Sequence, residues 1–391
     1  NIQTIYRVRC LMMTSRSRQY GVALVAALIL MASIVFILGN IFYRHQISVA
    51  QSTLVMHQNQ AYFLALSAES WAKQLLDEDA DESAFDHNNE LWSQAIPAMP
   101  VDGGLINGCI SDMQSRFNLN SLVKYTNATQ LTSVINSENN SHATVWNNIL
   151  RLKEIPPDQS RLETIIDWID KDSSTIGTSG AEQEIYESMR PPRMIADSQI
   201  VQPSELAEVM GYNLIEVQQL MPLITALPVA LKTKPNQIEP YAININTAAN
   251  ELLLAMGGDF DMIFKDAVIN NRPFEQIQDF YDKLGFELGY PEDNIKQRWP
   301  EDLIAIATQF FELYLEVTLG EARIEVRSII MRRFNADSVI LSRSMTTVPA
   351  SIDKNSASAL LGKMLGKESD DEAENNFDEE QVVPACITIG A

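Results

Sequence analysis

The sequence predicts an α+β fold in which a long N-terminal helix packs on a small antiparallel sheet and a large helical domain is inserted into that sheet. Three observations predict it. An apolar run over residues 22–42 continues in helical spacing, residues 121–307 follow a helical period, and apolar residues alternate strictly from Phe311 to Leu319. Helices repeat every 3.6 residues and strands every two, so a change of period indicates a change of element.

The first element is basic and then apolar. Residues 1–21 hold four arginines and no acidic residue, and residues 22–42 hold no charge. About 20 apolar residues cross a bilayer as a helix, whereas the apolar part of a cleaved secretory signal has about 7–15. Helical spacing then continues, so we expect one helix over residues 22–78, with 22–42 in the membrane. A generic single-pass signal anchor is the alternative.

The charge of the chain limits its partners and its topology. The net charge is −22 for 391 residues, which leaves −26 after the basic leader. Such a surface repels nucleic acid and anionic lipid headgroups, so we expect no nucleic-acid partner. Arginines before an apolar helix predict a cytoplasmic N-terminus and an exported bulk.

The remaining elements follow in order. A polar acidic link is expected at 77–89, a strand near 105–111, and helices such as Ala143–Ile155 and Leu214–Leu227 within the inserted block. The alternating strand Phe311–Leu319 turns at Gly320 into two further strands, which predicts an antiparallel meander. The expected domains are 79–120 and 308–391 around the sheet and 121–307 for the insertion. Eight acidic residues at 367–380 predict a disordered tether.

Residues 243–280 resemble a helix-hairpin-helix (SAM-like) unit with a Gly257–Gly258 hairpin. This fold often binds DNA, because hairpin amides approach a phosphate closely. Here Asp259 and Asp261 lie at the hairpin and Lys265 alone opposes them. Like charge at the contact point disfavours phosphate, so we expect a scaffold role.

A cluster of acids is the best candidate for a ligand site. The candidate residues are Asp167, Asp170, Asp172, Glu182 and Glu184. Calcium takes six to eight oxygen ligands, and a flexible acidic loop supplies them, although the spacing here is not that of an EF-hand. The alternatives are a solvated loop at a helix end, or an Asp167 that caps a helix or pairs with Arg161 or Arg193. No catalytic constellation is found, so we expect no enzyme.

Four further stretches carry a family resemblance. They are CISDMQSRFNLNSL (109–122), TIIDWIDKD (164–172), GAEQEIYESMRPPR (180–193) and YAININTAANELL (241–253). In this order, behind the basic leader, they resemble the K-type minor pseudopilins of the type II secretion system. The resemblance implies a pilin-like fold and favours calcium at the acidic cluster.

The resemblance also implies processing. In the pilin class a prepilin peptidase cuts after the glycine that precedes the apolar helix, here between Gly21 and Val22, and the new terminus is methylated. Met13 would begin a compact leader, so residues 1–12 are expected to be an upstream extension. The fifth mature residue is usually Glu, which pairs with the amine of the subunit above. Here it is Ala26, which favours a place at the tip of the assembly.

The implied function is structural. A K-type subunit would sit in the bacterial inner membrane with its bulk in the periplasm, cap the pseudopilus tip and nucleate assembly. Its expected partners are the I-type and J-type minor pseudopilins, with the H-type as a third candidate, and the expected contact face contains Leu54, Ala61, Leu64 and Ala68. A pilin-like DNA-uptake receptor is the alternative.

Two cysteines lie beyond the membrane segment, Cys109 and Cys386. An even count in an oxidising compartment favours pairing. We therefore expect a Cys109–Cys386 disulfide, and two buried thiols are the alternative.

Overall fold

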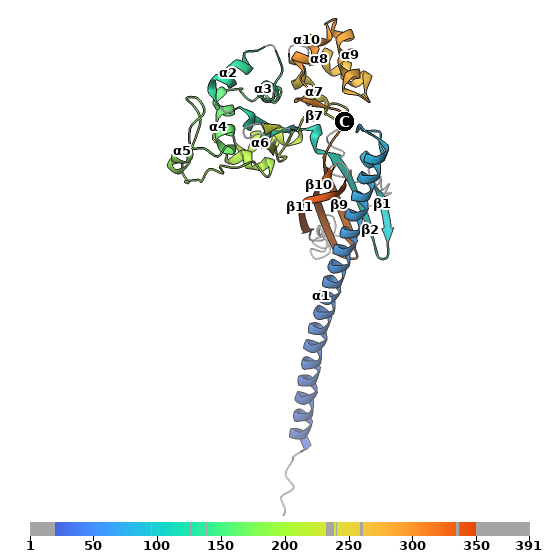
Figure 1. The fold of residues 1–391 in the computed structure, drawn as a ribbon. Helices are drawn as coiled ribbons and strands as arrows, with labels where there is room; N and C mark the ends of the chain where they lie inside the picture. Colours follow the sequence, from blue (N-terminus) through green and yellow to red (C-terminus); the bar gives the residue numbers. More distant parts are fainter. Residues whose placement is uncertain are drawn as a thin grey trace, which may run out of the picture. The chain divides into compact units, whose positions relative to one another are not determined.

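The computed structural model describes residues 20–348, apart from 95, 126, 138, 232–237, 240, 259–260 and 334–335. Most of the leader, the acidic segment 367–380 and Cys386 therefore lie outside the described residues. The described part contains a long helix, a five-stranded antiparallel sheet and a domain of short helices (Figure 1). The predicted fold class is confirmed.

Helix α1 spans Tyr20–Glu82, so it continues past the predicted end at residue 78. The segment contains no proline. Its last turns are acidic, yet two of these carboxylates bond to the sheet: Asp77 accepts from the Ser338 N–H at 3.0 Å, and Asp79 pairs with Arg332 at 3.0 Å. These bonds explain why the predicted acidic link begins as helix. The chain divides into two compact units, residues 1–59 and 60–391.

Within the second unit, α1 packs on the sheet through small residues. Its buried side chains recur every three or four positions, which places them on one face: Ala61, Ala65, Ala68, Ala72 and Leu76. They contact alternate residues of the sheet, including Ile106 and Leu315. The predicted apolar face of Phe311–Leu319 is thus confirmed, and alanines let the helix lie close to it.

The sheet has the order β1-β2-β9-β10-β11, with every neighbouring pair antiparallel. The strands are β1 (Ile96–Val101), β2 (Gly104–Asp112), β9 (Phe310–Leu319), β10 (Ala322–Arg333) and β11 (Ala336–Val348). β1 was not predicted, since it contains Pro97 and Pro100. Proline is tolerated at a sheet edge, and β1 lies there.

Strands β2 and β9 are neighbours although the residues between them number almost two hundred. Cys109 lies opposite Tyr314, and Asp112 lies opposite Phe311. The helical domain is therefore inserted between two adjacent strands, as predicted. The exact domain boundaries stay predictions.

The inserted domain consists of short helices around one apolar core (Figure 1). Its described helices are α2 (Ala128–Ile135), α3 (His142–Leu152), α4 (Gln159–Ile169), α5 (Gln183–Ser188), α6 (Leu214–Leu220), α7 (Asn250–Gly257), α8 (Asp261–Asn271), α9 (Ile277–Leu288) and α10 (Glu292–Arg298). Side chains cap several of them: Ser141 accepts from the Thr144 N–H at the start of α3, and Asn213 accepts from the Glu216 N–H at the start of α6. The structure also has a 3₁₀ helix at Pro203–Glu208.

Short strand pairs connect distant parts of the insertion. β3 (Phe117–Asn118) runs parallel to β4 (Ile224–Thr225), and β7 (Ile243–Asn244) runs parallel to β8 (Ile304–Ala305). β5 (Ala230–Leu231) pairs with β6 (Ile238–Glu239). Further 3₁₀ turns lie at Leu91–Ser93, Met113–Ser115, Leu119–Lys124 and Met221–Leu223.

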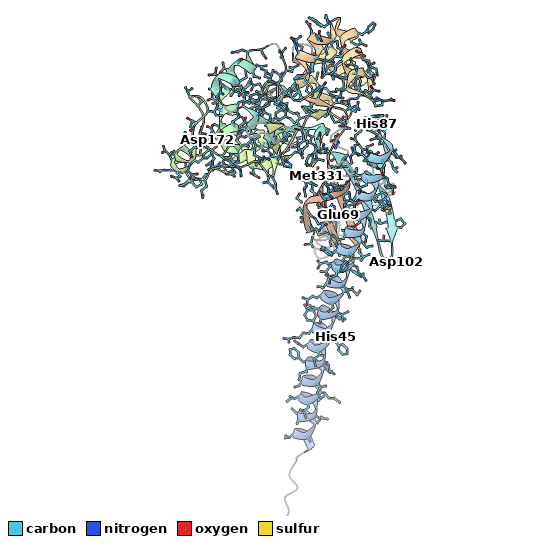
Figure 2. The ribbon with its side chains drawn as sticks, in the orientation of Figure 1. His45, Glu69, His87, Asp102, Asp172 and Met331 are labelled. Carbon is cyan, nitrogen blue, oxygen red and sulfur yellow. The ribbon has the colours of Figure 1, made fainter. Side chains whose placement is uncertain are left out.

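A buried glutamate joins α1 to the last two strands. Glu69 is 3% exposed and accepts hydrogen bonds from Ser328 Oγ on β10 at 2.5 Å and from Arg343 Nε on β11 at 2.9 Å (Figure 2 labels Glu69). A buried carboxylate is costly unless it is paired, and here both oxygens have partners. This contact fixes which residues of α1 meet β10 and β11.

A second buried carboxylate lies where the chain leaves the sheet for the insertion. Asp112, the last residue of β2, is 4% exposed. Its Oδ2 accepts from Asn244 Nδ2 at 3.0 Å, from Thr247 Oγ1 at 2.5 Å and from Thr308 Oγ1 at 2.6 Å. Burial raises the pKa of Asp112 to about 6, against the lowering effect of the two threonine hydroxyls.

We expect Asp112→Ala to lower the free energy of unfolding by about 3 kcal/mol or more, because it leaves several buried donors without an acceptor. The folded pKa of about 6 exceeds the ordinary 3.8, so the folded state binds more protons between these values. The contribution of Asp112 to stability therefore falls as the pH rises from about 4 to about 6, and the variant loses this slope. Urea unfolding at several pH values measures both effects.

Ser111→Ala is the matched control, because Ser111 Oγ has no hydrogen-bond partner. It should change stability by about 0.5 kcal/mol or less. Equal unfolding curves for Asp112→Ala and Ser111→Ala would show that Asp112 does not hold the junction.

Candidate functional site

Three of the five acidic residues predicted to form a ligand site lie close to one another in the structure. α4 ends at Ile169, a loop follows, and α5 begins at Gln183. In this loop, which Figure 2 marks with Asp172, one carboxylate oxygen from each of Asp170, Asp172 and Glu182 lies within 4.8 Å of the other two. Neither Asp167 nor Glu184 belongs to this group, and Glu184 is exposed.

Asp167 instead binds the backbone of this loop. It is fully buried in the last turn of α4, and its Oδ1 accepts the Ile176 N–H at 2.9 Å. Glu163, one turn earlier, accepts the Ser179 N–H at 2.9 Å. A Cβ atom at Gly180 would lie 2.1 Å from Asp167 Oδ2, so the loop approaches too closely for a side chain there.

The two arginines suggested as partners of Asp167 bond elsewhere. Arg161 pairs with Glu216 at 3.0 Å, and Arg193 pairs with Glu208 at 3.1 Å. The pairing alternative for Asp167 is therefore wrong. Its hydrogen bonds go to the backbone of the acidic loop.

The electrostatics of the loop indicate negative charge in excess. Burial, followed by the neighbouring carboxylates, raises the pKa of Asp170 and of Glu182 to about 7 each. Burial also raises the pKa of Asp167 to about 6. Asp170 Oδ1 and Glu182 Oε1 are buried without a hydrogen-bond partner. Hard oxygen donors of this kind, on a loop, fit calcium.

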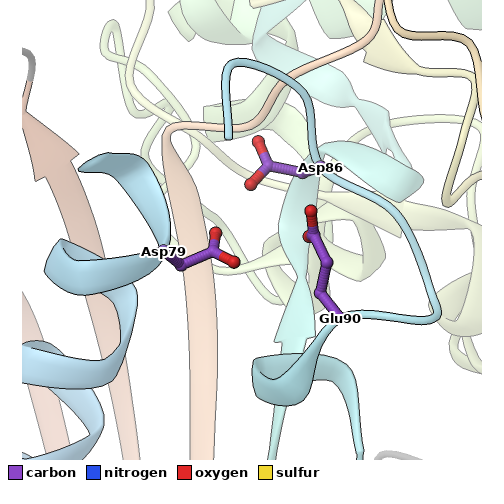
Figure 3. A group of neighbouring side chains, drawn as sticks. All are labelled: Asp79, Asp86 and Glu90. Carbon is purple, nitrogen blue, oxygen red and sulfur yellow. The ribbon is translucent and has the colours of Figure 1, made fainter. Parts of the chain in front are cut away.

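A second group of acids has a different environment. Asp79, Asp86 and Glu90 point toward one another (Figure 3), with one oxygen of each within 4.8 Å of the others. Arg332 pairs with Asp79 at 3.0 Å and with Asp86 at 2.5 Å, and Glu90 accepts from Trp92 Nε1 at 2.6 Å. Burial raises the pKa of Asp79 to about 7. Here the protein supplies its own cation, so the group is a structural ion-pair network.

The N-terminal half of α1 has the composition of a membrane span. An 18-residue window within Val22–Glu82 has a mean hydropathy of 2.9, and no part of it is buried. Among the described residues this is the one helix that passes that test. Gly21 and Val22 lie in its first turn, and Ala26 follows one turn later.

The predicted helix-hairpin-helix unit is present as α7 and α8, with Gly258 between them at a φ of +60°. Its basic residue Lys265 pairs with Asp266 at 3.1 Å. The unit is built into the core: Phe264 stacks on Trp299 at 4.8 Å, and Trp299 Nε1 donates to the Met256 carbonyl at 2.8 Å. These contacts favour the scaffold role. The predicted Asp259 lies outside the described residues.

Comparison with known proteins identifies the relationship. Two family models described as type II secretion system protein K match residues 115–229 and 243–297. Type II secretion system protein K of Aeromonas hydrophila is 26% identical over 85% of this chain and 98% of its own length. That of Pseudomonas aeruginosa is 26% identical over 84% of this chain and 94% of its own length.

Both comparisons therefore relate this chain to type II secretion system protein K. Its fold is similar to a chain in the crystal structure of the GspK-GspI-GspJ complex from enterotoxigenic Escherichia coli, with a TM-score of 0.59 and 22% identity. The likeness covers 74% of this chain and 96% of that one. The family is a structural component of the secretion system.

The stretches that carried the protein K resemblance coincide with the polar centres of the structure. The first contains Asp112, the second contains Asp167, Asp170 and Asp172, and the fourth contains Asn244 and Thr247. The roles of Asp112 and Glu69 were not predicted. The available signal was an acid on an otherwise apolar face, since Glu69 lies four residues after Ala65 and three before Ala72.

Two further predictions concern α1 and the cysteines. The face with Leu54, Ala61, Leu64 and Ala68 was expected to contact partner subunits. For Ala61 and Ala68 this is wrong, because they are 0% and 7% exposed against the chain's own sheet, and Leu64 packs against the same core. For Leu54, which lies in the first unit, the contact stays a prediction. Cys109 is 2% exposed and disulfide-bonded. Its predicted partner Cys386 lies outside the described residues, so that pairing stays a prediction.

Proposed function

We propose that this protein is a minor pseudopilin that is anchored in the inner membrane, caps the tip of the type II secretion pseudopilus and nucleates its assembly. The observation that carries the proposal is the helical domain inserted between β2 and β9 of a helix-on-sheet head. Neighbouring heads crowd one another in a tightly wound filament, and a head enlarged in this way fits once, at the end. Ala26 supports the same position, because it lacks the carboxylate that would pair with a subunit above.

The proposed partners are the I-type and J-type minor pseudopilins, as in the complex that contains a chain of similar fold. The H-type is a third candidate. The α1 face that contacts the sheet is occupied, so partner helices would meet the opposite face. Phe63, which is 65% exposed, lies on that opposite face, and Tyr62 and Trp71, which are 39% and 44% exposed, lie on its two flanks.

The function is tested by complex formation and by position. Phe63→Glu should weaken co-purification with the I-type and J-type subunits at least about tenfold, since it places a charge in an apolar helix contact. Phe286→Glu makes the same change at a phenylalanine that is 87% exposed in the helical domain, and it should bind normally. Gold-labelled antibody should mark one end of each pseudopilus.

Label along the whole shaft would contradict the tip position. Equal capture by Phe63→Glu and Phe286→Glu would contradict the proposed contact face. The DNA-uptake alternative predicts a gel shift with duplex DNA at low salt, and we expect none.

The membrane anchor is proposed to be retained after processing by a prepilin peptidase. The cut would fall between Gly21 and Val22, on the cytoplasmic side, with the bulk in the periplasm. N-terminal sequencing of membrane-extracted protein should begin at Val22, with a methylated amine. Gly21→Val should leave the leader attached. A mature terminus beyond residue 40 would indicate an ordinary signal peptide instead.

Calcium is proposed to bind at Asp170, Asp172 and Glu182. Asp167 would orient the loop, and Glu184 is left out because it lies outside the group. The crowded carboxylates and the unpartnered oxygens of Asp170 and Glu182 support this assignment. A bound cation would offset both the burial and the repulsion between carboxylates that raise the pKa values of Asp170 and Glu182.

Millimolar calcium should raise the melting temperature of the protein, because a ligand that binds the folded state stabilises it. Asp170→Asn with Asp172→Asn should remove most of this shift, whereas Glu184→Gln should keep it. Calorimetry should show that the unaltered protein and Glu184→Gln bind calcium with similar affinity and that the double variant binds it more weakly. An unchanged melting temperature with calcium would show that the loop is merely solvated.

A further inference from the structure

The sheet has a second face, on the side opposite α1, with a different composition. The helix-facing residues are apolar, whereas the alternate residues on β9 and β10 include Glu312, Tyr314 and Arg327. One row crosses four strands: Cys109 lies opposite Tyr314, Tyr314 opposite Arg327, and Arg327 opposite Ser344. The disulfide-bonded Cys109 therefore lies on the second face.

A cleft of about 700 Å³ lies between this face and the inserted domain. Its walls are residues of β9–β11, including Tyr314 and Arg327, and segments of the insertion within 201–226, together with Arg116. It lies within the second unit, and no residue of the acidic group lines it.

The cleft has an excess of hydrogen-bond donors. Arg116 and Arg327 share a single carboxylate, Glu312, at 3.4 and 3.8 Å. A third arginine on the wall, Arg343, is neutralised by Glu69. One negative charge thus faces two guanidinium groups, each of which can bind a carboxylate through two N–H groups.

Two buried donors in the cleft lack a partner. Thr225 is 1% exposed, lines the cleft, and its Oγ1 has no hydrogen-bond partner. Arg116 Nε is likewise buried and unpartnered. Buried polar groups are normally satisfied, so such donors point to an occupant that brings acceptors.

We propose that the cleft holds the chain's own acidic segment, Lys367–Glu380. Eight of its 14 residues are acidic, and the chain as a whole carries −22, so a cleft with excess positive charge has this segment as its natural complement. Carboxylates of the segment bind Arg116 and Arg327 and accept from Thr225. The remaining acids face solvent.

The chain path allows this placement. β11 ends at Val348, opposite Arg323, and Cys109 lies three strands and four residues away, roughly 20 Å by strand spacing and rise. The other cysteines of the chain are Cys10 and Cys386. A Cys109–Cys386 bond would anchor the far end of the segment on the second face, and the 37 residues between Val348 and Cys386 exceed the length needed.

The experiment is cleavage of the full-length, detergent-solubilised protein by a glutamate-specific protease, followed by peptide mapping. Arg116→Gln with Arg327→Gln should speed cleavage within 367–380 about tenfold, because charge-assisted hydrogen bonds are lost. Arg327→Gln alone should give a smaller increase; its side chain is 55% exposed, so the fold should tolerate the change. High salt should speed cleavage of the unaltered protein in the same way.

Arg323→Gln is the control, because Arg323 lies on the same strand but pairs with Glu316 at 2.9 Å, away from the cleft. It should leave the cleavage rate unchanged. A rate equal in the unaltered protein and in the double variant would overturn the proposal. Non-reducing mapping should link Cys109 to Cys386, and a link to Cys10 would overturn it as well. Neither result depends on the secretion function.

Discussion

The structure depends on the hydrogen bonds that join two points of the chain: the one where it leaves the sheet for the inserted domain, and the one where it returns to the sheet. The chain leaves β2 at Asp112 and returns to β9 at Phe310, and these points lie side by side. The Asp112 carboxylate accepts from Thr247, inside the insertion, and from Thr308, just before β9. Asp86 reinforces the return by accepting the Thr308 N–H at 2.6 Å while it pairs with Arg332. An insertion joined to a sheet by two strands would otherwise swing about them.

The helix and the sheet are fixed by a second set of polar contacts. Apolar packing of alanines on alternate strand residues supplies most of the burial, but it tolerates a slide by one turn. Glu69 with Ser328 and Arg343, and Asp79 with Arg332, do not tolerate it, because a slide would leave buried charges unpaired. Which face of α1 stays exposed is therefore set by buried glutamate and arginine as much as by the apolar stripe.

Sequence period predicted the fold well where a single face is buried. The alternation of Phe311–Leu319 predicted a strand and the run after Val22 predicted a helix, and both elements were confirmed. The face of α1 with Ala61 and Ala68 was wrongly predicted to contact partner helices, because small residues are equally suited to a partner helix and to the chain's own sheet. β1 was missed because Pro97 and Pro100 remove its strand pattern, and the role of Asp112 was missed because its partners are more than a hundred residues away. The acidic cluster was found in outline, but proximity along the chain did not separate Asp167 and Glu184 from the residues whose oxygens meet.

Three acidic groups of the described residues differ in environment, and the difference between them separates structure from ligand binding. Asp79 and Asp86 share the guanidinium of Arg332, which binds an oxygen of each. Asp112 is satisfied by hydroxyl and amide donors and needs no cation. Asp170 and Glu182 each retain a buried oxygen that no side-chain or backbone donor reaches, and the pKa of each is raised by burial and by like charge. An acidic group is a candidate cation site when the protein leaves buried carboxylate oxygens without a partner, and among the clustered acids of the described residues that condition holds at the loop after α4.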